Sequence, residues 1–91
     1  MYYVYLIQSI QFPEVVYVGF TKDLKKRFAC HNAGGSVHTS KYKPWKLISY
    51  FAFVDEKKAI AFEKYLKSQS GRVFAKKRLW WLERILRKIV F

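Results

Sequence analysis

Three ionisable side chains, Arg27, His31 and Glu63, stand at positions where two predicted helices should be apolar. Residues spaced i, i+3, i+4 and i+7 share one helix face. A charged group on such a face is costly unless it lies at the border, finds a partner or points at an anion. The two faces are Leu24, Arg27, Phe28 and His31, and Ala59, Phe62, Glu63 and Leu66.

These residue types suit a site for an anion and a metal ion. The planar guanidinium of Arg27 matches the geometry of a phosphate group. Glu63 needs a cation, either Arg27 or a metal ion, because an unpaired buried carboxylate is strongly destabilising. One polar site between two helices and a sheet is therefore predicted. Two simpler interpretations stay open, namely a border position for Arg27 and His31 and a structural ion pair between Arg27 and Glu63.

A predicted hairpin supplies two tyrosines. Residues 2–9 and 15–20 are rich in β-forming side chains and predict antiparallel strands joined by a turn at residues 11–14. This hairpin would place Tyr5 near Tyr17, with both hydroxyls at one surface. Composition alone favours a core position with a hydrated hydroxyl group for each tyrosine.

Two helices must carry the ionisable residues to this hairpin. We expect Thr21 to cap a helix over residues 22–32, since threonine is a favourable N-cap. Asp55 should cap a second helix that runs to about Ser68 and is broken at Ser70-Gly71.

A third strand is predicted for residues 45–54. Both of its faces are largely apolar, and a strand buried on both faces needs cover on both. We therefore expect this strand inside a three-stranded sheet with helices packed on its faces. Its predicted faces are Leu47, Phe51 and Phe53, and Ile48, Tyr50, Ala52 and Val54.

Two basic segments complete the chain. Residues 34–43 predict a loop in which Tyr42 stands between Lys41 and Lys43, as suits a nucleic-acid backbone and a stacked base, or simply a mobile solvated loop. Residues 72–91 predict a basic amphipathic helix that packs on the domain, binds a membrane surface or dimerises. Its apolar stripe is Leu79, Leu82, Ile85, Leu86 and Ile89.

The composition indicates one small domain with a polyanionic partner. The 91 residues are 52% hydrophobic, enough for one packed core. The net charge is +12, which favours nucleic acid as the partner and an anionic membrane surface second. A single cysteine, Cys30, excludes an internal disulfide. With no targeting segment and no membrane-spanning apolar stretch, we expect a cytoplasmic protein without integral membrane association.

The order and spacing of these motifs resemble the GIY-YIG nuclease domain. Tyr3-Val4-Tyr5 and Tyr17-Val18-Gly19 are followed by Arg27, His31 and Glu63. The resemblance covers about residues 2–77, and the overall layout is similar to that of the small stand-alone bacterial members. Two further segments share it: Pro44-Trp45-Lys46-Leu47 and Glu63-Lys64-Tyr65-Leu66-Lys67.

The resemblance implies an α/β fold with a three-stranded antiparallel sheet and helices on its faces. Residues 1–78 would form the nuclease domain, and residues 79–91 a basic amphipathic helix of the same domain. The implied activity is a metal-dependent endonuclease that hydrolyses phosphodiester bonds in DNA, or in RNA as a second substrate, in repair or recombination. The implied cofactor is Mg²⁺ or Mn²⁺, and the oligomeric state is not predicted.

The resemblance also implies roles for individual residues. Glu63 would hold the metal ion, and Arg27 would bind the scissile phosphate. Tyr5 and Tyr17 would orient or deprotonate the attacking water, and His31 would assist proton transfer. The lysines expected to contact nucleic acid are Lys22, Lys25, Lys26, Lys41 and Lys43.

Three positions depart from the family pattern. Tyr3 stands where a glycine usually opens the first tripeptide, and Phe20 where some repair members have lysine. The late asparagine of many members is absent, since Asn32 is the only asparagine. The missing asparagine favours the second hypothesis, a nucleic-acid-binding domain of the same fold that no longer cuts. Glu63 favours the nuclease, because binding a polyanion gives no reason for a carboxylate there. A third hypothesis is a protein that binds a membrane surface or a partner through its basic tail.

Overall fold

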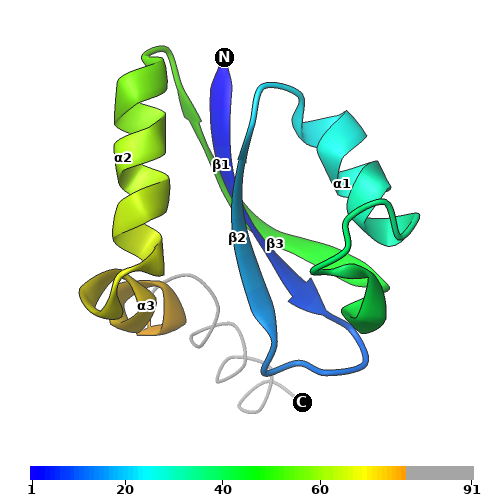
Figure 1. Cartoon of the computed structure of the whole chain (residues 1–91). Helices are drawn as coiled ribbons and strands as arrows, with labels where there is room; N and C mark the ends of the chain where they lie inside the picture. The colour runs from blue at the N-terminus through cyan, green and yellow to red at the C-terminus, as the bar shows by residue number, and fades with distance from the viewer. Residues whose placement is uncertain (78–91) are drawn as a thin grey trace, which may run out of the picture.

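The computed structural model describes residues 1–77, which form one sheet between two helical layers (Figure 1). The basic helix predicted for residues 79–91 lies outside the described residues. Within the described part of the chain, no helix is long and apolar enough to cross a membrane. In chain order the elements are β1 (Tyr2–Ser9), β2 (Val16–Thr21), α1 (Leu24–Asn32), the short 3₁₀ helix η1 (Ser40–Tyr42), β3 (Trp45–Phe53), α2 (Glu56–Lys67) and α3 (Gln69–Ala75).

The sheet is antiparallel with the strand order β2-β1-β3. The predicted three-stranded antiparallel sheet with helices on its faces is confirmed. The expectation that the third strand lies inside the sheet is wrong, because the central strand is β1 and β3 is an edge. Residues 4–9 of β1 are all buried, whereas Tyr50 in β3 is 53% exposed. Apolar composition alone does not distinguish a covered strand from an edge strand.

A β-bulge changes which side chains of β3 face α2. The pairing of β1 with β3 shifts by one residue and leaves Ile48 as the extra residue. Ile48 therefore packs in the same core cluster as Phe51 and Phe53, and the predicted alternation is wrong at this point. Leu47 and Tyr50 instead line a pocket on the other side of the sheet.

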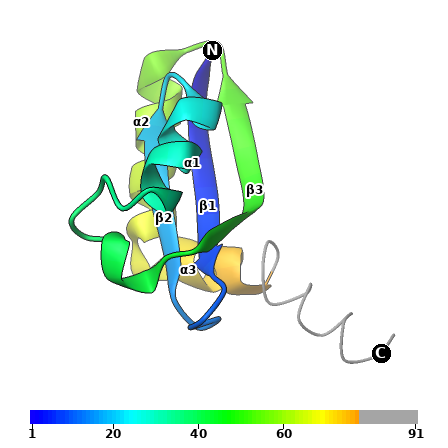
Figure 2. The ribbon, with the colours of Figure 1, turned by 90° about the vertical axis from the view of Figure 1, so that its right-hand side faces the viewer.

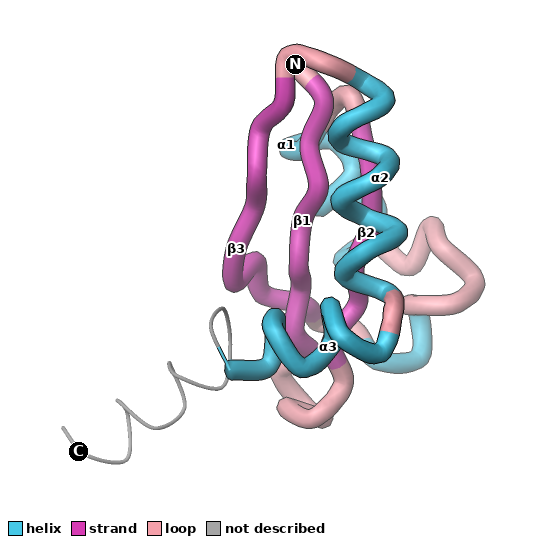
Figure 3. The backbone as a smooth tube through the Cα atoms, turned by 90° about the vertical axis from the view of Figure 1, so that its left-hand side faces the viewer, coloured by secondary structure: helices cyan, strands magenta, loops and turns pink. Residues whose placement is uncertain are grey.

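The helices cover opposite faces of the sheet. Helix α1 lies over one face (Figure 2), and α2 with α3 lies over the other, with α3 across one end of α2 (Figure 3). Alternation along β1 builds a core on each side. Val4 and Leu6 pack with α2 and α3, while Tyr5 and Ile7 pack towards α1.

Aspartates cap the first two helices. The side chain of Asp23, not Thr21, accepts the amide of Lys26 at 3.1 Å, so α1 begins two residues later than predicted. The Thr21 hydroxyl instead accepts the amide of Asp23 at 3.1 Å and orders the approach to the helix. Asp55 caps α2 as predicted, since it accepts the amide of Lys57 at 2.8 Å.

The chain turns sharply between α2 and α3. The break falls at Ser68, whose hydroxyl accepts the amide of Gly71 at 3.2 Å and caps α3. The predicted break at Ser70 and Gly71 is therefore wrong, because both residues lie within α3. A Cβ atom at Gly71 would collide with the carbonyl oxygen of Tyr65. Glycine lets α3 fold back closely against the end of α2.

We predict that Gly71→Ala lowers the free energy of unfolding by about 1–3 kcal/mol, because the added methyl group forces the two helices apart. Urea denaturation followed by circular dichroism measures this loss. Ser70→Ala is the control, since Ser70 is exposed in the same helix and should change stability by only about 0.5 kcal/mol or less. Equal midpoints for the two variants would contradict the packing described at Gly71.

Candidate active site

Two tyrosines of the hairpin lie on the face of the sheet that α1 covers. Tyr5 pairs with Gly19 and Ile7 with Tyr17 across β1 and β2, so both tyrosines share that face. Their ring centroids are 6.3 Å apart. A Cβ atom on Gly19 would collide with the Tyr5 ring and hydroxyl. Glycine at this position therefore lets the Tyr5 ring lie against β2.

His31 lies between the two tyrosines. Its side chain is fully buried, so the border interpretation is wrong for this residue. The Nε2 atom is 2.8 Å from the Tyr5 hydroxyl oxygen, at hydrogen-bond distance. The imidazole centroid is 5.1 Å from that of Tyr17 and 5.7 Å from that of Tyr5. His31 thus contacts both phenols.

Thr39 completes the hydrogen bonds of His31 and was not predicted. Its Oγ1 atom is 2.8 Å from the Nδ1 atom of His31, and both residues are buried. The Thr39 carbonyl accepts the indole N–H of Trp45 at 3.0 Å, which holds the loop on the sheet. The interpretation of a solvated loop is therefore wrong at Thr39, which is buried. A lone threonine in an aperiodic segment carries no signal that would have identified it.

Arg27 lies beside Tyr5 and is only partly buried. Its hydrogen-bonding interaction with the phenol raises the pKa of Arg27 further above its ordinary value, so the guanidinium is permanently charged. Arg27 and Lys26 also line a small pocket of about 170 Å³ beside the end of β2. Asp23, which caps α1, also lines this pocket, so its lining carries two cations and one carboxylate and remains attractive to an anion.

Burial fixes the protonation states of the inner pair. Burial raises the pKa of Tyr5 above its ordinary value, the interaction with Arg27 opposes the rise, and Tyr17 adds to it. Burial, reinforced by the charge of Arg27, lowers the pKa of His31. At neutral pH Tyr5 is therefore a phenol and His31 a neutral imidazole that can accept a proton.

The side-chain partner of Glu63 is Lys67 and not the predicted Arg27. Its Oε2 atom lies 3.0 Å from Lys67 Nζ, and the ion pairs of the described residues include none between Glu63 and Arg27. The Glu63 side chain is 21% exposed, which leaves it accessible to solvent. Sequence analysis missed Lys67, although its i, i+4 spacing from Glu63 is the signal for such a pair.

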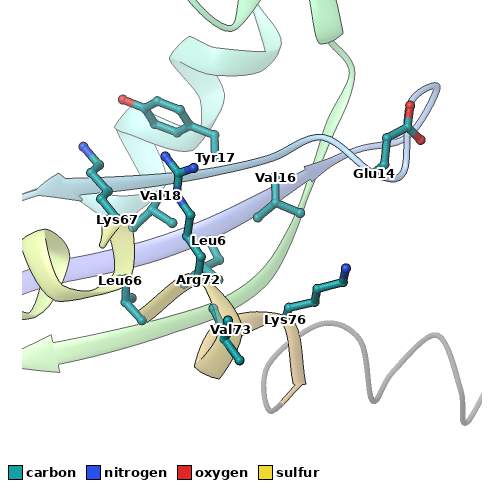
Figure 4. A pocket seen from close by; sticks show the side chains of 11 residues that line it. Leu6, Glu14, Val16, Tyr17, Val18, Leu66, Lys67, Arg72, Val73 and Lys76 are labelled. Carbon is teal, nitrogen blue, oxygen red and sulfur yellow. The ribbon is translucent and has the colours of Figure 1, made fainter. Parts of the chain in front are cut away.

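Lys67 links the two sides of the sheet. Its Nζ atom lies 6.0 Å from the centroid of the Tyr17 ring while it pairs with Glu63. This is feasible because β2 is an edge strand, past which a side chain of α2 can extend, as Figure 4 shows for Lys67 and Tyr17. Glu63 is near enough to Tyr5 to contribute to its raised pKa. Four of the predicted residues, Tyr5, Tyr17, Arg27 and His31, therefore lie together on the α1 side. Glu63 approaches them from the α2 side, past the edge strand β2.

The lysines expected to bind nucleic acid are all exposed. Lys22 makes a long ion pair of 3.8 Å with Glu56, and Lys41 lies over the Tyr42 ring. Tyr42 itself packs edge-on against Phe12 and Trp45. Its ring is therefore mostly committed to the core rather than to a stacked base. The other three lysines of the predicted set are Lys25, Lys26 and Lys43.

A metal ion at this site would need ligands from the substrate. The described residues contain no group of three or more His, Cys, Asp or Glu side chains that could hold a metal ion. Glu63 offers one accessible carboxylate. Mg²⁺ commonly binds one or two carboxylates and takes its other ligands from waters and substrate phosphates. Glu63 is compatible with such an ion when a phosphate is present.

Comparison with known proteins gives one family. The family model described as the GIY-YIG catalytic domain matches residues 1–78. A UPF0213 protein of Streptococcus pyogenes serotype M3 is 34% identical over 71 residues, which cover 77% of this chain and 75% of that protein. UPF0213 proteins from serotypes M1 and M12 match with the same identity and coverage.

We predict that Thr39→Val destabilises the protein by about 1–3 kcal/mol, because it leaves the buried Nδ1 atom of His31 without a partner. Thr39→Ser keeps the hydroxyl group and should lose less stability than Thr39→Val. Urea denaturation gives the stabilities, and ¹⁵N shifts of the imidazole report which ring nitrogen carries the proton. If Thr39→Val matches Thr39→Ser in stability and in these shifts, the Thr39 hydroxyl does not hold the imidazole.

The lowered pKa of His31 predicts a stability that falls in mild acid. The unfolded chain takes up a proton near about pH 6.5, whereas the folded chain resists protonation of His31. The free energy of unfolding should therefore be fully maintained above about pH 6.5 and decline below it. Urea denaturation at several pH values measures this decline. The decline in stability below about pH 6.5 should persist in His38→Gln and be smaller in His31→Gln. A wild-type free energy of unfolding that stays constant down to about pH 5 would refute the assignment of this decline to His31.

Proposed function

Because the chain belongs to the GIY-YIG catalytic domain family, we propose that it is an endonuclease that hydrolyses phosphodiester bonds in DNA. Members of this family are typically endonucleases. The observation that supports the proposal is the cluster at the edge of β2, where Tyr5, His31 and Arg27 interact beside Tyr17 and Glu63. A cytoplasmic location and a role in repair or recombination belong to the same proposal and rest on the family resemblance.

Arg27 is proposed to bind the scissile phosphate. Its guanidinium is charged at every accessible pH and presents parallel N–H groups that match two phosphate oxygens. Partial exposure leaves it accessible, and Lys26 adds a second cation in the adjoining pocket. Negative charge grows on the transferred phosphate in the transition state, so Arg27 would stabilise that state more than the ground state.

Tyr17, Tyr5 and His31 are proposed to handle the attacking water. Tyr17 is the more accessible phenol and would orient the water for attack on phosphorus. The water oxygen bonds to phosphorus, and the bond to the leaving oxygen breaks as that oxygen takes a proton from solvent. The water proton passes to Tyr5 as the Tyr5 proton moves to Nε2 of His31, which later releases it to solvent. His31 suits this role because it is neutral at rest, and Arg27 stabilises negative charge on Tyr5 during the transfer.

Glu63 is proposed to hold Mg²⁺ or Mn²⁺ together with oxygens of the substrate. A bound divalent ion supplies positive charge where the phosphate becomes more negative. Lys67 neutralises the Glu63 carboxylate in the free protein. With Glu63 engaged by a metal ion, the Lys67 ammonium would be free to pair with a nucleic-acid phosphate.

A second candidate function is nucleic-acid binding without cleavage. Two observations favour it: the described residues hold no preformed cluster of metal ligands, and Glu63 already has a counterion in Lys67. This candidate shares the basic surface with the nuclease but needs no metal ion. Binding without nicking under every metal condition would distinguish it.

We predict metal-dependent nicking of supercoiled DNA by the wild-type protein and at least about 100-fold slower nicking by Glu63→Gln and by Arg27→Lys. Glu63→Gln removes the charge that would bind the metal, and Arg27→Lys removes the planar pair of donors. Gel assays with Mg²⁺, Mn²⁺ or EDTA measure the rates, and binding of DNA in EDTA should persist in Glu63→Gln.

Glu56→Gln is the matched control for that assay. It makes the same carboxylate-to-amide change at the start of α2, away from the proposed metal site. Because it also frees Lys22 from a 3.8 Å ion pair, it should not slow nicking. Nicking by Glu63→Gln at the wild-type rate would rule out the proposed role of this carboxylate. Nicking that continues in EDTA would rule out the metal.

A further inference from the structure

A second cavity adjoins the candidate site on the other side of β2. It has a volume of about 520 Å³ and lies between the sheet and α3 (Figure 4). Its floor is apolar and comes from both strands of the hairpin and from the two C-terminal helices of the described part. The floor residues are Leu6, Val16, Val18, Leu66 and Val73.

The rim of this cavity, which we call the hairpin groove, is basic. Lys67, Arg72 and Lys76 line it, and Glu14 is the only acidic residue among the described residues that do so. In Figure 4 the Arg72 side chain extends from α3 towards β2. An apolar floor with a cationic rim suits a molecule that is both flat and anionic.

The hairpin groove is continuous with the candidate site. Tyr17 and Lys67 line the groove, and the same two residues border the site through His31 and Glu63. A nucleic-acid strand whose phosphate lies at Arg27 can therefore continue past the edge of β2 into the groove. Arg72 and Lys76 would meet the phosphates that follow.

We propose that the hairpin groove binds an unpaired nucleotide next to the scissile phosphate, and that substrates with a single-stranded segment are preferred. This inference rests on the proposed function. An unpaired base exposes a flat face that stacks on aromatic rings regardless of sequence, and Tyr17 offers such a ring beside the apolar floor. A base within a duplex keeps its faces stacked and shows only its edges. The groove volume is that of a small-molecule site rather than of a duplex-binding cleft.

The competing occupant is the end of the chain itself. Residues 78–91 follow directly after Lys77, next to the groove residue Lys76. Their sequence is apolar enough to fill the floor, but it carries Arg78, Arg84, Arg87 and Lys88 against one acid, Glu83. Adding this positive segment to a cationic rim is electrostatically unfavourable, whereas a nucleotide is complementary to it.

Fluorescence anisotropy in EDTA tests the proposal with the full-length chain. The probes are a labelled DNA duplex and the same duplex with a short unpaired tail. The wild-type protein should bind the tailed duplex about tenfold more tightly. Val73→Glu places a carboxylate at a half-exposed position of the floor and should abolish this preference. Lys57→Ala lowers the net charge by the same amount on the outer side of α2 and should keep it.

Each result of these binding measurements supports or overturns the groove proposal. Equal wild-type affinity for the two probes would overturn the groove proposal, whereas nicking in the gel assay would still support the nuclease. If Val73→Glu still prefers the tailed duplex, the unpaired nucleotide binds elsewhere. Should Val73→Glu fail to fold, Arg72→Gln takes its place in this test. Absence of preference together with a sharp stability loss in Val73→Glu would assign the groove to residues 78–91. Failure to bind either probe would overturn both proposals.

Discussion

The buried hydrogen-bond chain from Tyr5 through His31 to Thr39 is the interaction on which the site depends. Each bond is 2.8 Å long, and all three residues are nearly inaccessible to solvent. A buried polar group left without a hydrogen-bond partner is strongly destabilising. Displacing one of these three side chains would therefore require the other two to shift with it. These hydrogen bonds link the central strand, α1 and the loop before β3, and they hold His31 against the phenols.

The edge position of β2 allows one site to draw on both faces of the sheet. Tyr17 and His31 come from the side of α1, and Glu63 and Lys67 come from the side of α2. In the interior of a sheet, the strands would separate these two groups completely. At an edge, a lysine can extend past the backbone, which explains how Lys67 contacts Tyr17 while pairing with Glu63. The hairpin groove begins at the same edge.

Helix periodicity predicted much of this arrangement, and long-range packing explains where it failed. The spacing correctly placed His31 on the buried face of α1, whereas Arg27 and Glu63 lie partly exposed at the borders of their helix faces. Periodicity cannot rank partners, so the local i, i+4 lysine was overlooked in favour of a distant arginine. The contribution of Thr39 depends on how a loop folds back, which no local pattern records. The edge position of β3 and its bulge arise from pairing between strands that are far apart in sequence.

The proposed nuclease requires Glu63, His31 and the two phenols to surround one place where a metal ion and a phosphate meet. Paramagnetic broadening by Mn²⁺, recorded by NMR with a non-hydrolysable oligonucleotide bound, tests it directly. Broadening should be strongest at Glu63, Tyr17 and His31 and should disappear in Glu63→Gln. Broadening centred elsewhere, or unchanged in Glu63→Gln, would contradict the existence of this single site.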